Sequence, residues 1–453
     1  MNNELGTMLS LPLTLLFTIS FFLIAWYRFR VGLFFLFLLL PTYLIRFHVG
    51  PVPSTLLEVM IGILLLVWII REWQLARAKK DFFVRLTAPI RLLYTTHRSL
   101  AIALTLFLLG ATISVYTAVH LRAAAGEWRA FFIEPVLLFF LLIVTVKNKK
   151  DRHAILLGLL LCGLITSFLS IYQHFTGFMV PWSFWQNRHT YRVTGWYGYP
   201  NAVGLGLAPL LPLAWYGLLE NTKTRKQENK KTLTVFVFLF SCFFVLTATL
   251  ALIFAKGVGP MIGALAGIGV ILGGIKKIRP YLLTVGIIAI IGFCLLPSTN
   301  LFKQKLLAQS DSGKIRRDMW AETTEYLSHH PIAGTGLASY ATRIWPYRIN
   351  KHIEVFSLPH NLFLSIWVEI GLIGLMGFIW IIVWFYRVSI YAMIKNTRLG
   401  KQPDHIILAL IASMTTIMVM GLVDTPYLKN DLVILFWVLP ALLICSLPAT
   451  SDT

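Results

Sequence analysis

The sequence has few charged residues and few cysteines for its length. Of its 453 residues, 13% are charged and 57% are hydrophobic, whereas soluble globular chains carry roughly a quarter charged residues. The four cysteines, Cys162, Cys242, Cys294 and Cys445, all fall in apolar segments, where a thiol packs as a small hydrophobic group. We therefore expect neither a disulfide framework nor a metal site, and we expect lipid to surround most of the chain.

Long apolar runs, by contrast, are abundant, and the mean hydropathy is +0.74. The bilayer interior offers no partner for stray backbone groups, so such a chain must cross the membrane as helices or as a closed barrel. Runs of about 20 residues favour helices, because barrel strands alternate over about 10 residues. The predicted fold class is all-α, a polytopic transmembrane helical protein of about 12–13 spans. The spans are predicted near residues 9–27, 31–47, 56–71, 99–119, 131–146, 154–172, 202–219, 233–253, 258–274, 281–297, 361–386, 405–423 and 430–447.

The positive charge is placed in the loops between these runs. The formal net charge is +21, which in a soluble protein would suggest nucleic acid, but here we expect no nucleic-acid partner because the pattern is that of membrane topology. One alternate set of loops carries 25 of the 40 Lys and Arg residues and is predicted to be cytoplasmic. The chain then divides into N-terminal transmembrane helices over 1–297, one large extracytoplasmic loop over 298–360, and C-terminal transmembrane helices over 361–453. The loop over 173–201 is predicted to lie on the same outer side.

The outer loop is predicted to contain a helix of its own. Apolar and neutral side chains recur at three- and four-residue spacing from Ile315 to Leu327, which indicates a helix. Asp311 and its serine neighbours are suitable caps at its start, and Pro331 followed by Gly334 ends it.

His360 and Asn361 stand where the outer loop enters the next apolar run. A histidine there has the intrinsic pKa of a general base, about 6.5, and can take a proton from a hydroxyl at neutral pH. The alternative is an interfacial polar residue that caps the helix together with Asn361, and position alone favours this alternative.

Four cations on the predicted outer side suit an anionic ligand. Arg316 and Arg317 begin the loop helix, Arg192 lies in the other outer loop, and Lys256 separates two apolar runs. Guanidinium groups bind phosphate oxygens through two parallel hydrogen bonds, so a diphosphate headgroup is a fitting ligand. Attraction of the arginines to anionic lipid, and for Lys256 a simple turn, are the alternatives. Carboxylates in or beside the spans are also functional candidates: Glu58, Glu134, Glu369, which alternatively holds an arginine in place, and Asp424.

Several of these residues occur in a recognisable order. Arg316-Arg317-Asp318-Met319-Trp320 is followed by Pro331-Ile332-Ala333-Gly334-Thr335-Gly336-Leu337, then by His360-Asn361, nine residues, and Gly371-Leu372-Ile373-Gly374. This order resembles the O-antigen ligase and Wzy-type polysaccharide polymerase superfamily. The stretch from Arg192 to Tyr199-Pro200-Asn201 resembles that family's Arg-Gly-aromatic-Pro-Asn segment. Lys256 stands where many members have arginine, which keeps the charge without the two-pronged guanidinium.

The resemblance implies a membrane glycosyltransferase that needs no cofactor and no metal. It would transfer a glycan from an undecaprenyl-diphosphate carrier to the hydroxyl of a glycolipid, glycan or protein acceptor at the extracytoplasmic face of the cytoplasmic membrane. By the same resemblance, His360 is the base, and substrate binding falls to Arg316 or Arg317 with Arg192, Lys256, Asn201 and Asn361. A polymerase of the same superfamily and a lipid-linked glycan flippase remain alternatives. A flippase of the secondary-transporter type would have inverted repeats or helices broken at mid-membrane, and the sequence indicates neither, although Gly257, Gly259 and Pro260 interrupt one apolar segment.

Overall fold

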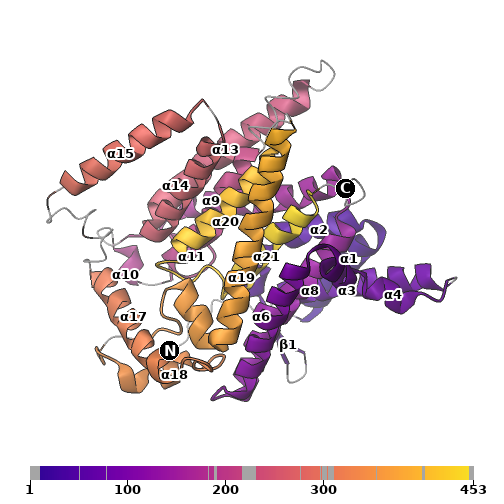
Figure 1. Cartoon of the computed structure of the whole chain (residues 1–453), viewed down its shortest axis with the longest axis horizontal. Helices are drawn as coiled ribbons and strands as arrows, with labels where there is room; N and C mark the ends of the chain where they lie inside the picture. The colour runs from indigo at the N-terminus through magenta and orange to yellow at the C-terminus, as the bar shows by residue number, and fades with distance from the viewer. Residues whose placement is uncertain are drawn as a thin grey trace. The chain divides into compact units, whose positions relative to one another are not determined.

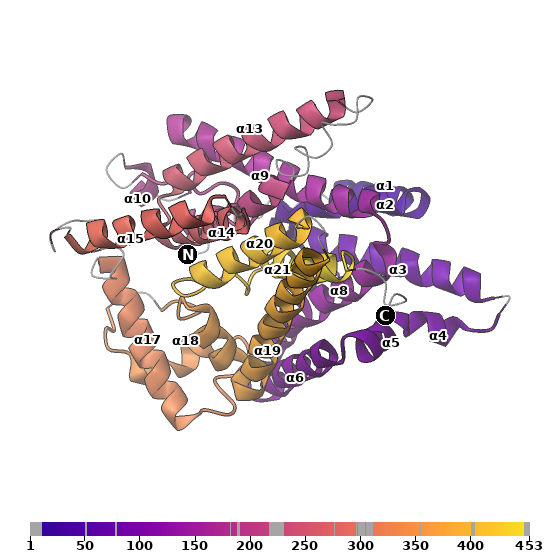
Figure 2. The same cartoon turned by 45° about the horizontal axis from the view of Figure 1, so that its top comes forward.

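The chain is described from a computed structural model. It describes residues 11–447 except 50–51, 78, 182, 188–190, 217–230, 276, 296, 298–303, 305–310, 353–354 and 400–403. Residues 223–230 of one loop in the basic set predicted to be cytoplasmic, and the first part of the predicted extracytoplasmic loop over 298–360, therefore lie outside the described residues. Figures 1 and 2 show that helices dominate what is described, with one small hairpin.

Five helical segments among the described residues are long and apolar enough to cross a membrane. They are Arg98–Tyr116, Leu121–Thr145, Lys149–Thr176, Val235–Ala255 and Leu362–Arg398. Shorter apolar helices accompany them, among them Val258–Gly274, His405–Met420 and Asn430–Ile444. The predicted class, an all-α polytopic membrane protein, is confirmed.

The described chain forms two compact units, each built from discontinuous segments. The first contains 1–101, 130–256 and 429–453, and the second contains 102–129 and 257–428. The helix α6 (Arg98–Tyr116) and the short π-helix η2 (Trp128–Ile133) carry the chain from one unit to the other.

The first unit packs its helices around α9. Its elements are α1 (Leu11–Tyr27), α2 (Phe29–Leu38), η1 (Leu40–Leu44), β1 (Arg46–Val49), β2 (Val52–Thr55), α3 (Leu56–Ala76), α4 (Phe82–Leu86), α5 (Ala88–Thr96), α8 (Glu134–Thr145), α9 (Lys149–Thr176), α10 (Ser183–Gln186), α11 (Pro200–Leu207), α13 (Lys231–Ala255) and α21 (Asn430–Ile444). Both α2 and α13 lie against α9, and α21 lies against α8. At Gly158 the backbone of α2 approaches closely, because a β-carbon there would lie 2.5 Å from the Phe34 carbonyl oxygen.

Two differences from the predicted helices have local causes. The apolar run predicted as one span over 202–219 is interrupted after α11 at residues 208–209, where Pro209 lacks the N–H that a continuing helix needs. The run predicted as one span over 31–47 is α-helical only to Leu38. It continues as the 3-10 helix η1 and ends in the antiparallel hairpin of β1 and β2, with Arg46 opposite Thr55, which was not predicted. The hairpin leads into α3, whose first turn is closed by a capping box between Thr55 and Glu58. Glu58, a candidate functional acid, therefore has a structural role at this helix start.

The second unit carries the helix predicted within the large loop over 298–360. Its elements are most of α6, α7 (Leu121–Glu127), α14 (Val258–Gly274), α15 (Arg279–Leu295), α17 (Asp311–His329), α18 (Tyr340–Arg343), η4 (Trp345–Tyr347), α19 (Leu362–Arg398) and α20 (His405–Met420). Helices α14 and α20 lie side by side (Figure 1), and a β-carbon at Gly263 would lie 2.8 Å from the Thr416 carbonyl oxygen. The helix predicted from Ile315 to Leu327 is confirmed as α17, which ends just before Pro331.

Candidate functional site

His360 is placed by the start of α19. The Asn361 side chain caps this helix, and its Oδ1 accepts hydrogen bonds from the backbone N–H groups of Phe363 and Leu364, each at 3.0 Å. The Asn361 Nδ2 donates to the Leu422 carbonyl oxygen at 3.0 Å. His360 itself has a positive φ of 48°, a left-handed conformation that a non-glycine residue adopts at a cost of about 1–3 kcal/mol. The capping that the sequence offered as an alternative to function is therefore present, and it belongs to Asn361.

The His360 ring pairs with Asp424, which lies 64 positions further along the chain. The distance from His360 Nδ1 to Asp424 Oδ1 is 3.3 Å, and Asp424 is buried while the His360 side chain is 29% exposed. Asp424 Oδ1 also accepts from the Thr425 backbone N–H at 2.9 Å. A buried carboxylate held in this way orients the imidazole.

The electrostatics of Asp424 favour its charged form. Burial by itself would raise the pKa of this carboxyl. The hydrogen bond and charge of His360, with the charge of Arg316 and the Thr425 N–H, instead hold the pKa of Asp424 below its ordinary value. The Asp424 carboxylate is thus negative at neutral pH, and it lies next to both His360 and Arg316.

The side chains of Arg316 and Arg317 point in different directions, because successive residues of a helix are rotated by about 100°. Arg316 Nη2 lies 3.9 Å from Asp424 Oδ2, with 26% of the arginine side chain exposed. The Arg316 Nε is buried and has no hydrogen-bond partner among the described residues. Arg317 is exposed. Trp320, one turn after Arg316, donates from Nε1 to the Pro359 carbonyl oxygen at 2.9 Å, which fixes α17 beside the residue that precedes His360.

The other predicted residues gather in the first unit. Arg192 donates from Nε to the Ala255 carbonyl oxygen at 2.7 Å and from Nη2 to Asn201 Oδ1 at 2.8 Å. Its guanidinium carbon lies 5.1 Å from the centroid of the Trp185 ring. Lys256 directly follows Ala255, is exposed, and has a positive φ of 51° at the turn between α13 and α14. Arg192, Asn201 and Ala255, the residue before Lys256, therefore form one cluster. The sequence spacing alone did not predict this contact.

The loop that carries Arg192 is held by Gln173 of α9. The Gln173 Oε1 accepts from the backbone N–H groups of Thr194 and Gly195 at 3.0 and 2.9 Å, and its Nε2 donates to the Gly195 carbonyl oxygen at 3.1 Å. Gln173 is fully buried, so these bonds are protected from water and fix the loop ahead of α11.

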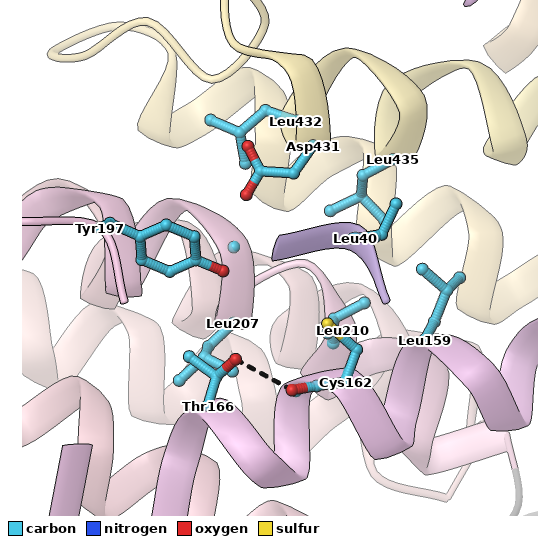
Figure 3. A pocket seen from close by; sticks show the side chains of 12 residues that line it. Leu40, Leu159, Cys162, Thr166, Tyr197, Leu207, Leu210, Asp431, Leu432 and Leu435 are labelled. Atoms are coloured by element: carbon cyan, nitrogen blue, oxygen red, sulfur yellow. Dashed lines mark hydrogen bonds between the residues drawn. The ribbon is translucent and has the colours of Figure 1, made fainter. Parts of the chain in front are cut away.

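A pocket in the same unit lies next to this loop. Figure 3 shows Tyr197 and Asp431 facing it, with Thr166 and Cys162 of α9 below. The rest of its lining is largely leucine. Beside it, Lys429 Nζ lies 3.3 Å from the Asp431 carboxylate and 3.8 Å from the centroid of the Tyr197 ring. Burial lowers the pKa of Lys429, and the charge and hydrogen bond of Asp431 oppose that shift. These contacts bind the start of α21 to the loop before α11.

Asp424 is the residue whose role the sequence did not reveal. It was one of four candidate carboxylates, and no local pattern joined it to His360. Asp424 lies just after the apolar run of α20, beside Thr425 and Pro426, and His360 lies just before the apolar run of α19. Two polar residues at the ends of neighbouring predicted spans were the one feature of the sequence that could have indicated the pair. Glu369, also considered, contacts no arginine among the described residues; its Oε2 accepts from the Ala338 backbone N–H at 2.9 Å.

The fold and the geometry define a polytopic membrane protein whose second unit holds a histidine, a buried aspartate and an arginine together. Residues 243–379 match a protein family described as O-Antigen ligase. The resemblance to the O-antigen ligase-like superfamily is thereby confirmed over this segment, which includes Lys256, Arg316, Arg317, His360 and Asn361. Arg192, Asn201 and Asp424 lie outside the matched residues. No curated protein matches the chain.

Proposed function

We propose that the chain is a membrane glycosyltransferase of the O-antigen ligase type. In this proposal it transfers a glycan from an undecaprenyl-diphosphate carrier to an acceptor hydroxyl at the extracytoplasmic face of the cytoplasmic membrane. The observation that carries the proposal is the pairing of His360 with Asp424 beside Arg316. Further support comes from the family match, which spans the histidine and the arginine.

In this mechanism, His360 is the general base. With its Nδ1–H donated to Asp424, the Nε2 atom has a lone pair that accepts the proton of the acceptor hydroxyl. The acceptor oxygen forms a bond to the anomeric carbon as the bond from that carbon to the diphosphate oxygen breaks. The electron pair of the broken bond leaves with the diphosphate, and attack from the opposite side inverts the anomeric centre. Asp424 stabilises the imidazolium that results.

The leaving group needs cations more than it needs an acid. A diphosphate is already a stable anion, so the protein lowers the barrier by neutralising the charge that develops on it. Arg316 suits this role because its guanidinium is partly exposed and its charge is only loosely paired, at 3.9 Å from Asp424. We assign Arg192 and Lys256, with Asn201, to the binding of the donor as well, and Arg317 to the attraction of anionic lipid. Asn361 sets the direction of α19 directly after the base.

The experiment is glycan transfer by the purified chain in proteoliposomes. An undecaprenyl-diphosphate-linked oligosaccharide is incubated with candidate acceptors, and the products are identified by mass. A product of acceptor plus one glycan supports a ligase, and a ladder on the carrier supports a polymerase. His360→Ala is expected to abolish transfer, whereas His352→Ala, a change at an exposed histidine of the same outer loop, leaves it unchanged. Equal transfer by His360→Ala and wild-type protein contradicts the proposal, and carrier movement across the bilayer without a new product favours a flippase.

A further inference from the structure

Helix α19 is broken inside the membrane-spanning segment, where the sequence predicted no broken helix. Gly371 has φ 69° and ψ −177°, so the helix consists of 362–370 and 372–398. A break of this kind frees backbone groups that lipid does not satisfy. Some part of the protein must therefore supply hydrogen bonds at this depth.

The outer loop supplies them through residues 331–339, which we call the joint segment. The Thr335 backbone N–H and hydroxyl both donate to the Val368 carbonyl oxygen, at 2.6 and 2.9 Å. The Leu372 N–H donates to the Ile332 carbonyl oxygen at 2.9 Å, and Trp367 Nε1 donates to the Pro331 carbonyl oxygen at 2.7 Å. The joint segment thus provides partners for the Val368 carbonyl and the Leu372 N–H, which would pair with each other in an unbroken helix.

One glycine of the joint segment, Gly334, and one at the break in α19, Gly371, permit this close approach. A β-carbon at Gly334 would lie 2.4 Å from the Val368 carbonyl oxygen, and one at Gly371 would lie 2.3 Å from the Ile332 carbonyl oxygen. Both glycines have positive φ. The Gly-Thr-Gly and Gly-x-x-Gly motifs of the sequence therefore meet at one place in the structure.

The joint ties one end of α17 to α19, and the candidate site ties the other. The joint segment follows the end of α17 directly, and Ile332 and Ala333 lie next to Gly371 at the break in α19. At the opposite end, Trp320 donates to Pro359 and Arg316 faces Asp424. Figure 2 shows α17 and α18 on the same side of α19. Two separate attachments fix the direction of α17, and through it the distance between Arg316 and His360.

Glu369 holds the most strained part of the joint. Ala338 has a positive φ of 54°, which is unfavourable for a residue with a β-carbon. Its N–H donates to Glu369 Oε2 at 2.9 Å, and Glu369 is 2% exposed. A carboxylate buried in a spanning helix is costly, so a specific hydrogen bond to a strained amide is a physical reason for its presence. The Glu127 carboxylate faces the same amide.

We infer that Glu369 is a positioning residue for the reaction, acting through the Ala338 amide and the joint segment on the placement of Arg316 relative to His360 and Asp424. This inference rests on the proposed function. The Glu369 side chain accepts from the Ala338 N–H and forms no hydrogen bond or ion pair with His360, Asp424 or Arg316 among the described residues, so its loss is expected to change the turnover step while the groups of the site are all retained. A misplacement of about 1 Å in such a site lowers the rate on the order of 100-fold.

The test combines hydrogen exchange with transfer kinetics on the full-length chain. We compare Glu369→Ala with Glu369→Gln, which retains an oxygen acceptor for the Ala338 N–H. The control is Glu325→Gln, a change at an acid on α17 whose side chain is 65% exposed. In Glu369→Ala we expect amide exchange over 335–340 to rise at least about tenfold and kcat to fall on the order of 10–100-fold. Because Arg316 is displaced and not removed, the donor KM should rise less than the roughly tenfold loss of donor affinity expected for Arg316→Gln. Glu369→Gln is expected to recover most of both, and the control to match wild type.

Other outcomes are decisive as well. Wild-type exchange over 335–340 in Glu369→Ala contradicts the hold on the joint, and faster exchange with unchanged kcat contradicts the positioning role. If wild-type protein transfers no glycan, the proposed function fails, and exchange alone decides whether Glu369 holds the joint. If Glu369→Ala does not accumulate, Trp367→Phe takes its place in the test. This change removes the hydrogen bond from Trp367 to the joint segment, and Trp367 is partly exposed. An unchanged kcat in Trp367→Phe contradicts the inference that the joint segment positions the site.

Discussion

The indole Nε1 of Trp320 donates a hydrogen bond to the carbonyl oxygen of Pro359 at 2.9 Å. This bond joins α17 to the peptide immediately before His360. It places the side chain one turn earlier, Arg316, toward Asp424 and the histidine. One hydrogen bond thus connects the two parts of the candidate site that come from α17 and α19.

We predict that Trp320→Phe lowers glycan transfer about three- to tenfold. The phenyl ring keeps most of the packing but loses the N–H donor, and a net loss of about 1 kcal/mol is typical of a single hydrogen bond. Transfer assays and thermal unfolding in detergent measure the two effects. A variant with full activity and a lowered unfolding temperature indicates that the bond stabilises the fold without ordering the site.

Arg316 and Arg317 are expected to differ when each is changed to glutamine. Arg316→Gln removes the charge that faces Asp424, and we expect donor affinity to fall at least about tenfold, within the range for a charge-assisted contact. Arg317 is exposed and is expected to change donor affinity less than twofold, in the range of a solvated charge. Donor binding in nanodiscs of constant lipid composition measures both. Equal and mild losses of donor affinity in the two variants would indicate that both arginines only attract anionic lipid.

The pH dependence of stability should report the Asp424 pair. The pKa of this carboxyl is lowered in the folded chain, so its contribution to stability is present above the ordinary aspartate pKa, about 3.9, and is lost as pH falls through the folded value. We expect Asp424→Asn to be less stable than wild type near pH 6. The difference should shrink as the pH falls below about 4. Unfolding temperatures between pH 6 and pH 3 measure it, and a constant difference contradicts the assignment.

Lys256 permits a test that separates backbone strain from charge. Its φ of 51° suits glycine, so Lys256→Gly removes an unfavourable conformation worth roughly 1 kcal/mol and removes the cation. We expect the variant to unfold at a slightly higher temperature and to bind donor several-fold more weakly. Lys256→Arg serves as the control that retains charge. If Lys256→Gly is stabilised with unchanged donor binding, Lys256 marks a turn only.

Gly371→Ala is predicted to destabilise the chain strongly. Its β-carbon would lie 2.3 Å from the Ile332 carbonyl oxygen at a positive φ, and strain of this kind costs at least about 1–3 kcal/mol. Gly269→Ala is the matched control, since a β-carbon there meets nothing within 4 Å. Accumulation in membranes and unfolding temperature measure both variants. Similar values for the two would show that the backbone at Gly371 relaxes without penalty.

Asp424 and the joint segment show where sequence reasoning ends. The periodicity from Ile315 to Leu327 predicts α17 because helical spacing is local. The partner of His360, in contrast, stands 64 positions away, and no spacing rule links them. Arg316 and Arg317 are adjacent in sequence, yet a helix turns by about 100° per residue, so only the placement of α17 decides which one faces Asp424.

The sequence by itself determined that this is a polytopic helical membrane protein, because a long apolar run in lipid must satisfy its backbone hydrogen bonds within a helix. It also determined the helix α17 and the motifs that carry the family resemblance. Only the tertiary structure decided that the glycine motifs meet at a break in α19, that His360 pairs with Asp424, and that Arg192 bonds to Asn201. These contacts join residues far apart along the chain or select among equivalent neighbours, and their energy depends on packing that no local pattern encodes.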